Sequence, residues 1–214
     1  MGTRGSALAL AQSAVMAREL MRCHPALEIE TVKITTSGDL FATQTPVQAH
    51  DLMQGAKGLF VKEIEEALLD SRIDFAVHSA KDLPAALAAG LTIAAYPERE
   101  DPRDAFIGRN GLSWAAFKAG KLGTSSLRRK VQLLMVKPNL SVIPVRGNVD
   151  TRLKKLQSGE FDGIVLALAG LRRLGLGHIA HEVLPEEVLL PAPGQGALAI
   201  EASPGQARVM DILK

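Results

Sequence analysis

The sequence is poor in several residue types, and each shortage excludes a class of protein. Cys23 is the single cysteine, so the chain can form neither an internal disulfide nor a cysteine-type structural zinc site. The apolar runs, such as residues 163–170, stop far short of the roughly 20 residues that span a bilayer. The amino-terminal stretch includes Gln12, Arg18 and Glu19, which a signal-peptide core excludes. We therefore expect a cytoplasmic protein that has no membrane segment.

Acidic residues are scarce in one part of the chain. Residues 121–173 hold 11 Lys and Arg against 3 Asp and Glu, a net charge of +8, and the rest of the chain has a net charge of −6. Such a basic region attracts anions, and nucleic acid is the usual partner. However, only one of the chain's eight aromatic residues, Phe161, falls in this region, which is too few to stack bases. A small polyanion is an equally good candidate.

What the chain does contain is typical of a folded α/β protein. Apolar residues make up 47% and charged residues 22% of the sequence, close to the globular average. Short β-branched runs alternate with amphipathic stretches, which predicts helices between mainly parallel strands. Helices are expected over 6–22 and 60–70, and from about 126 and about 148. Strands are expected over 29–34, 75–78, 91–96, 141–145, 163–168 and 197–200, and in a run ending at 123.

Stretches rich in proline, glycine and charge interrupt this pattern. Residues 36–58 show no sustained periodicity, so much of this segment is interpreted as a mobile surface loop or lid. Residues 97–104 form a charged, proline-bounded connector, and residues 190–196 are rich in helix and strand breakers. Both are suited to a domain crossing, so the basic half of the chain is predicted to form a second lobe between two hinges.

The first candidate site is the hydroxyl cluster Thr124, Ser125 and Ser126, followed by Arg128 and Arg129. It lies where a predicted strand ends and a helix begins. The first turn of a helix offers free N–H groups and a positive dipole end, and arginine forks bind carboxylate or phosphate. The alternative is an ordinary serine cap next to a solvated arginine pair.

A second segment, residues 145–152, has the same design. Arg146 ends a predicted strand, Gly147 permits close backbone approach, and Asn148 opens a helix that carries Arg152. Because the carboxyl ends of parallel strands share one edge of a sheet, both helix starts are expected at a ligand-binding edge. Surface ion pairs of Arg146 and Arg152 are the alternative, and few acids lie nearby in the sequence.

A third segment, residues 78–84, follows the predicted strand that ends at His78. Asp82 is an acid/base candidate with a cation, Lys81, beside it, and Pro84 stiffens the turn. Since Asp and Pro are routine in turns, an ordinary turn is the alternative. We interpret His78 as a packed or hydrogen-bonded residue. No metal site is expected, because His178 and His181 have no third ligand in view.

Taken together, the motifs of this chain resemble the porphobilinogen deaminase (hydroxymethylbilane synthase) family, from residue 2 to about residue 201. The joint set is far more specific than any one motif. The matching segments are Gly2–Ser6, Lys57–Glu63, His78–Pro84, Glu98–Phe106, Gly123–Arg129, Arg146–Asn148 and Leu190–Gly196.

The resemblance implies a fold and a reaction. The fold has two lobes of mixed, mainly parallel sheet flanked by helices, like type II periplasmic binding proteins. The first lobe would comprise residues 1–97 and 197–214, and the second residues 98–196, with hinges near 98–103 and 190–196. The enzyme is a transferase that joins four porphobilinogen units head to tail with loss of ammonia, giving hydroxymethylbilane in tetrapyrrole biosynthesis. Each pyrrole carries two carboxylates, which suits a lobe rich in arginine.

The resemblance also implies roles for individual residues. Asp82 matches the family's catalytic aspartate, which assists proton transfer and stabilises the cationic intermediate. The other matching positions are expected to hold the carboxylates of the cofactor or substrate. They are Arg4, Ser6, Lys81, Thr124, Ser125, Ser126, Arg128, Arg129, Arg146, Asn148, Arg152 and Gln195.

One departure from the family pattern concerns the cofactor. The family carries a covalent dipyrromethane on a cysteine of a third domain, and this sequence has no counterpart of that domain, so no covalent cofactor is expected on this chain. Cys23 lies outside the family's motifs. The expected partners are small pyrrole polycarboxylates, with no nucleic acid and no membrane, and a monomer is expected. The alternative function is a non-catalytic, two-lobed binding module for a small polycarboxylate.

Overall fold

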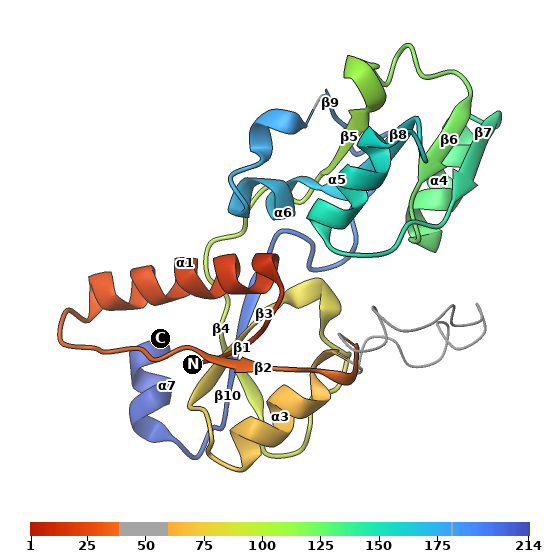
Figure 1. Ribbon diagram of the computed structural model, residues 1–214. Coiled ribbons are helices and arrows are strands. Elements are labelled where there is room, and N and C mark those ends of the chain that lie inside the picture. Colours follow the sequence, from red (N-terminus) through yellow and green to blue (C-terminus); the bar gives the residue numbers. More distant parts are fainter. Residues whose placement is uncertain (39–59, 181) are drawn as a thin grey trace. The chain divides into compact units, whose positions relative to one another are not determined.

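A computed structural model describes residues 1–38, 60–180 and 182–214, which form two compact units (Figure 1). Unit 1 comprises Met1–Arg99 and Ala197–Lys214, and unit 2 comprises Glu100–Gly196. The boundaries expected from the sequence were 97/98 and 196/197. The chain therefore leaves unit 1 once, builds all of unit 2, and returns. The segment 36–58, interpreted from the sequence as a mobile surface loop or lid, lies almost wholly outside the described residues.

Unit 1 contains a five-stranded sheet of mixed direction, in the order β2-β1-β3-β10-β4. β1 pairs in parallel with β2 and β3, and β10 pairs antiparallel with β3 and β4. Its elements are β1 (Gly2–Arg4), α1 (Ala7–Cys23), β2 (Val32–Ile34), α3 (Lys62–Leu69), β3 (Phe75–Ser79), β4 (Thr92–Ala95), β10 (Leu198–Ala202) and α7 (Ala207–Leu213).

Unit 2 contains a second five-stranded sheet, in the order β7-β6-β8-β5-β9. β6 pairs in parallel with β7 and β8, and β5 pairs antiparallel with β8 and β9. Its elements are β5 (Asp104–Gly108), β6 (Gly120–Gly123), α4 (Leu127–Val136), β7 (Leu140–Ile143), α5 (Val149–Gln157), β8 (Gly163–Ala167), α6 (Leu168–Arg173) and β9 (Glu182–Val183).

The reversed strand of each sheet is the first strand that follows a crossing between the units. β5 follows the outward crossing and β10 follows the return. Leu198, at the start of β10, pairs with Ser79 at the end of β3, and Asp104, at the start of β5, pairs with Ala167 at the end of β8. In each unit, the crossing segments therefore attach at the edge where the parallel strands end. The predicted fold class, two mixed and mainly parallel sheets flanked by helices, is confirmed.

Helices cover both faces of the sheet in unit 1. Side chains alternate across a strand, so Phe75 and Val77 of β3 pack with Met16 and Leu20 of α1. The intervening Ala76 packs on the opposite face, in a cluster with Ile64, Ala67 and Leu68 of α3. None of the helices in the described part of the chain is long and apolar enough to cross a membrane.

Unit 2 has the same layering with larger side chains. Ala105 and Ile107 of β5 pack in a cluster that includes residues of α5 and α6. Phe106 faces the other way and contacts the rings of Trp114 and Phe117, whose centroids lie 5.4 and 5.3 Å from its own. Leu133 of α4 joins this second cluster. Both helix starts predicted at the sheet edge thus belong to helices that a core holds in place.

The two crossing segments meet at Gly196. Its carbonyl oxygen accepts hydrogen bonds from the backbone N–H of Glu100 at 3.2 Å and from Nη2 of Arg173 at 2.6 Å. Its φ is +87°, and a Cβ at this position would overlap the carbonyl oxygen of Glu100. Glycine is therefore required here for both conformation and space.

Replacing Gly196 by alanine is predicted to destabilise the protein strongly. The added methyl group both strains the backbone and separates the crossing segments, so we expect a loss of about 3 kcal/mol or more in the free energy of unfolding. Urea denaturation measures this loss. Gly175→Ala is the control, because Gly175 has a φ of +72° but no atom within 4 Å of an added Cβ. It should cost only about 1–2 kcal/mol, and equal losses in the two variants would contradict this account.

Candidate functional site

The edge of unit 1 where β1 and β3 end carries four of the predicted residues. Arg4 ends β1, and Ser6 caps α1 by accepting a hydrogen bond from the N–H of Ala9 at 3.3 Å. The segment Ala80–Asp82 forms a short 3-10 turn directly after β3 and contains Lys81. Since β1 and β3 are parallel neighbours, their carboxyl ends bring these segments together.

Three of these residues, Arg4, Ser6 and Asp82, line one depression in unit 1. The guanidinium of Arg4 lies 4.2 Å from the centre of the Phe60 ring, a cation–π contact that holds the charge at the wall of the depression. Gln12 of α1 donates from Nε2 to Oγ of Ser79 at 2.9 Å. The depression therefore joins a carboxylate, a guanidinium and hydroxyl groups within one unit, a set suited to binding an anionic or N–H-bearing ligand.

His78 is packed beneath this surface, as its sequence context suggested. Its Nε2 lies 3.0 Å from Oε2 of Glu201 in β10, and both side chains are buried. Glu65 of α3 lies near this pair, and its pKa is raised by burial and by the charge of Glu201, against the lowering effects of the Ala88 N–H and of His78. His78 and Glu201 thus link the neighbouring strands β3 and β10.

In unit 2 the two predicted helix starts lie side by side. β6 and β7 are parallel neighbours whose last residues, Gly123 and Ile143, pair with each other. Oγ of Ser125 donates to the carbonyl oxygen of Val145 at 2.7 Å, which ties the hydroxyl cluster to the segment that begins at Arg146. Ser126 caps α4, with its Oγ accepting from the N–H of Arg129 at 3.4 Å, and Thr124 is buried below it.

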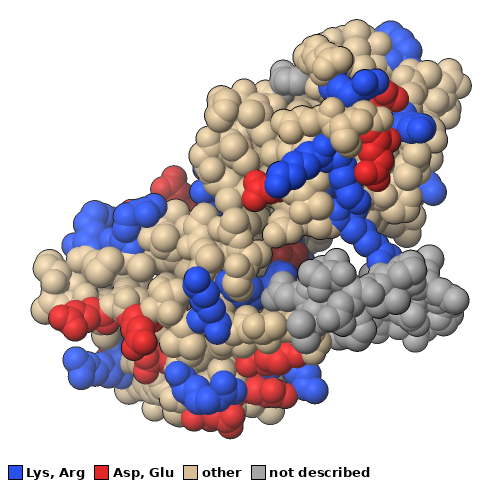
Figure 2. Space-filling view, viewed as in Figure 1, with Lys and Arg blue, Asp and Glu red and all other residues tan. Residues whose placement is uncertain are grey.

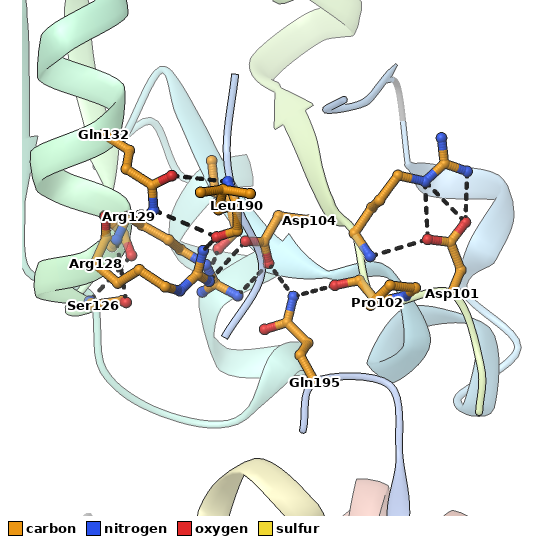
Figure 3. Close-up of polar contacts among 12 residues, drawn as sticks. Asp101, Pro102, Asp104, Ser126, Arg128, Arg129, Gln132, Leu190 and Gln195 are labelled. Carbon is orange, nitrogen blue, oxygen red and sulfur yellow. Dashed lines mark hydrogen bonds and ion pairs between the residues drawn. The ribbon is translucent and has the colours of Figure 1, made fainter. Parts of the chain in front are cut away.

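The arginine pair of this edge contacts a carboxylate that the sequence analysis did not single out. Asp104, fully buried at the start of β5, accepts from Nη2 of Arg128 at 2.8 Å and from Nη2 of Arg129 at 2.7 Å (Figure 3). Gln195, a predicted cofactor-binding residue, is also buried and donates from Nε2 to Oδ1 of Asp104 at 2.9 Å. Neither arginine is a solvated surface charge, because Asp104 engages both.

Charge and hydrogen bonding decide the ionisation of Asp104. Burial alone acts to raise its pKa, but the charges and hydrogen bonds of Arg129 and Arg128 outweigh burial and lower it below the ordinary value. Asp104 is therefore ionised at neutral pH. Each arginine has a further protein partner: Nη1 of Arg129 donates to the carbonyl oxygen of Val165 at 3.2 Å, and Nη1 of Arg128 donates to that of Leu190.

Arg152 differs from this pair. It belongs to α5, and its Nε donates to the carbonyl oxygen of Gly147 at 2.7 Å. Burial and, after it, repulsion from Arg129 lower its pKa. No ion pair joins Arg152 to an acid in residues 1–38, 60–180 and 182–214. The nearby Arg146 is exposed, as is Asn148, the residue that precedes α5.

The predicted residues fall into two groups. Unit 1 holds Arg4, Ser6, Lys81 and Asp82, and unit 2 holds the remaining nine. Basic side chains lie across the visible face of unit 2 (Figure 2). Reasoning from sequence missed Asp104, although an acid placed immediately before the apolar run 105–107 is a sign of a buried charge with a partner. It also missed Gln12 and Glu201, which no local pattern marks.

A family model and the sequences of known proteins both match this chain. A sequence model described as "Porphobilinogen deaminase, dipyromethane cofactor binding domain" matches residues 1–211. A protein named porphobilinogen deaminase from Sorangium cellulosum (strain So ce56) is 54% identical over all of this chain, which covers 70% of that relative. One of the same name from Roseiflexus castenholzii is 48% identical, with 99% of this chain and 69% of the relative aligned.

Solved structures that are similar to the chain include two bacterial proteins. The BvgS VFT2 domain of Bordetella pertussis has a TM-score of 0.47 at 18% identity, covering 95% of this chain and 75% of that one. The arginine-specific periplasmic binding protein STM4351 of Salmonella typhimurium has a TM-score of 0.46 at 12% identity, covering 94% of this chain and 78% of that one.

Proposed function

We propose roles for these residues from one premise: this chain belongs to the porphobilinogen deaminase family. The family forms hydroxymethylbilane in tetrapyrrole biosynthesis, acts on pyrrole substrates and uses a dipyrromethane cofactor. The chain spans about 70% of the length of the Sorangium relative. The assignment of steps and binding roles to particular residues of this chain, given below, is our proposal.

The edge of unit 2 binds the carboxylates of the pyrroles. The observation that carries this role is Arg152, a half-buried guanidinium that has no acid partner in the described part of the chain. A guanidinium stays protonated in proteins, so burying one without a counter-ion is costly unless an anion completes the site. The hydroxyl groups of Ser125 and Ser126 and the exposed Arg146 lie on the neighbouring strand ends and extend the same surface.

Asp82 is the proposed acid/base residue of unit 1. Its carboxylate lies in the depression that Arg4 and Ser6 also line, on a turn fixed by a hydrogen bond from the Ala80 N–H to the Ala197 carbonyl at 3.0 Å. A carboxylate held in this way can accept a hydrogen bond from a pyrrole N–H and stabilise a cationic intermediate as ammonia leaves. Lys81 and Arg4 supply positive charge for the carboxylates of the same ligand.

The covalent link to dipyrromethane is proposed to lie elsewhere than on Cys23. Cys23 is the last residue of α1, which has 17 residues and starts next to Ser6. At 1.5 Å per residue the helix is about 25 Å long, so Cys23 lies at the opposite end from the depression that contains Asp82. A dipyrromethane attached to Cys23 would therefore lie at the far end of α1 and would not reach this depression.

Asp82→Asn is expected to abolish nearly all turnover while leaving the fold intact. The amide is nearly isosteric with the carboxylate but neither accepts a proton nor carries charge, and general acid/base groups contribute roughly 10²- to 10⁴-fold to rate. The measurement is hydroxymethylbilane production from porphobilinogen by the chain joined to the family's third domain. Turnover by the Asn variant within about twofold of the unmodified protein would favour the alternative, a binding module in which Asp82 does no chemistry.

Arg146→Leu and Arg152→Leu are each expected to weaken binding of porphobilinogen by about tenfold or more, since a hydrogen bond to a charged group contributes about 1.5–3 kcal/mol. Titration calorimetry gives the dissociation constants. Lys154→Leu is the matched control, because it removes the same charge from an exposed position of α5. Equal losses in all three variants would mean that diffuse charge, and not these arginines, binds the ligand.

A further inference from the structure

We propose that Asp104 is a positioning residue of the carboxylate-binding edge: it fixes Arg128 and Arg129 in place so that Arg152 and the start of α4 can receive the ligand. This inference rests on the proposed function of unit 2. The observation behind it is a buried acid in a place where acids should be unfavourable. An anion-binding surface that keeps its own carboxylate loses positive charge, so the carboxylate must contribute something other than attraction.

The geometry shows what Asp104 contributes. Its two carboxylate oxygens are divided between the two arginines, with Oδ2 bonded to Arg128 and Oδ1 to Arg129 (Figure 3). Gln195 shares Oδ1 and also donates to the carbonyl oxygen of Pro102 at 2.6 Å. One side chain therefore joins the first turn of α4, the start of β5 and the segment that returns to unit 1.

Electrostatics give the second part of the argument. Arg129 is buried, and its charge lowers the pKa of the half-buried Arg152. Arg129 and Arg152 therefore repel each other within this edge, and Asp104 is the carboxylate that neutralises Arg129. Without Asp104, two guanidinium groups that cannot lose their protons would have to move apart. The arginine side chains would then no longer be in position to bind the carboxylates of the ligand.

This account and simple charge counting predict opposite results for Asp104→Asn. Removing an acid from an anion-binding edge raises its net positive charge, which by attraction alone should tighten the binding of porphobilinogen. If Asp104 positions the arginines, the same change should weaken binding by about tenfold or more. Asp150→Asn is the matched control, because it removes one acidic charge from an exposed position in the first turn of α5. It should bind no more weakly than the unmodified chain.

A double-mutant cycle separates positioning from a general loss of structure. Calorimetry with porphobilinogen is carried out on the 214-residue chain and on Asp104→Asn, Arg128→Leu and the double variant, each confirmed as folded by circular dichroism. If Asp104 acts through Arg128, the double variant should lose about as much affinity as one single variant. Independent effects would multiply, giving a loss of about a hundredfold, and would overturn the proposal, as would unchanged or tighter binding by Asp104→Asn.

Asp104→Asn leaves two arginines without their counter-ion and could fail to fold. In that case the variant Asp104→Asn/Arg129→Gln, which removes both charges of the buried pair together, is measured in its place. Its affinity is compared with that of Arg129→Gln alone: a further loss of about tenfold supports the proposal, because Arg128 has then also lost its fixed position, and an affinity equal to that of Arg129→Gln alone overturns it. Absence of binding by the unmodified chain would instead contradict the proposed function itself, and this inference with it.

Discussion

The buried carboxylate of Asp104 is the interaction on which the arrangement of unit 2 depends. Taking a carboxylate out of water costs several kcal/mol unless charged hydrogen bonds replace the lost hydration. Asp104 has three such replacements, from Arg128, Arg129 and Gln195. Because these partners come from α4 and from the segment that returns to unit 1, satisfying one charge fixes the positions of several elements at once.

The topology explains why so many functional groups gather at one edge of each sheet. β5 and β10 enter their sheets from the edge at which the crossing segments attach, and they are the reversed strands. The remaining strands of each sheet therefore end at that edge, and the loops that follow them carry the polar residues. Arg4, Ser6 and Asp82 meet in unit 1 for this reason, as do the hydroxyl cluster and Arg146 in unit 2.

Much of this could be predicted from the sequence, because the patterns involved are local. Hydrophobic periodicity located α1, α3, α4 and α5, and the serine caps of α1 and α4 mark where those helices begin. The breaker-rich stretches marked the two crossings. β1, β5, β9, α6 and α7 were not predicted, since these elements are short and their stability comes from pairing or packing with distant segments. β2 is also shorter than expected: its strand starts at Val32 and not at Ile29.

The partners of the charged residues were the least predictable feature. For Arg128 and Arg129, the sequence pattern suggests only an anion-binding role or a solvated arginine pair. Their partner is Asp104, which lies more than 20 residues away in the sequence. It stands at the start of β5, the strand that pairs with β8. Arg152 has no such partner in the described residues, and this contrast, which only the three-dimensional arrangement reveals, is the reason to assign ligand binding to it.

The central claim is that unit 2 binds pyrrole carboxylates at the edge of its sheet where Asp104 fixes Arg128 and Arg129 in position. The most direct test is a crystal structure of the chain with porphobilinogen bound. The account predicts a ligand carboxylate within about 3 Å of the Arg152 guanidinium, while Asp104 keeps its hydrogen bonds to both Arg128 and Arg129. A ligand carboxylate that takes the place of Asp104 between these two arginines, or a ligand bound away from this edge, would contradict it.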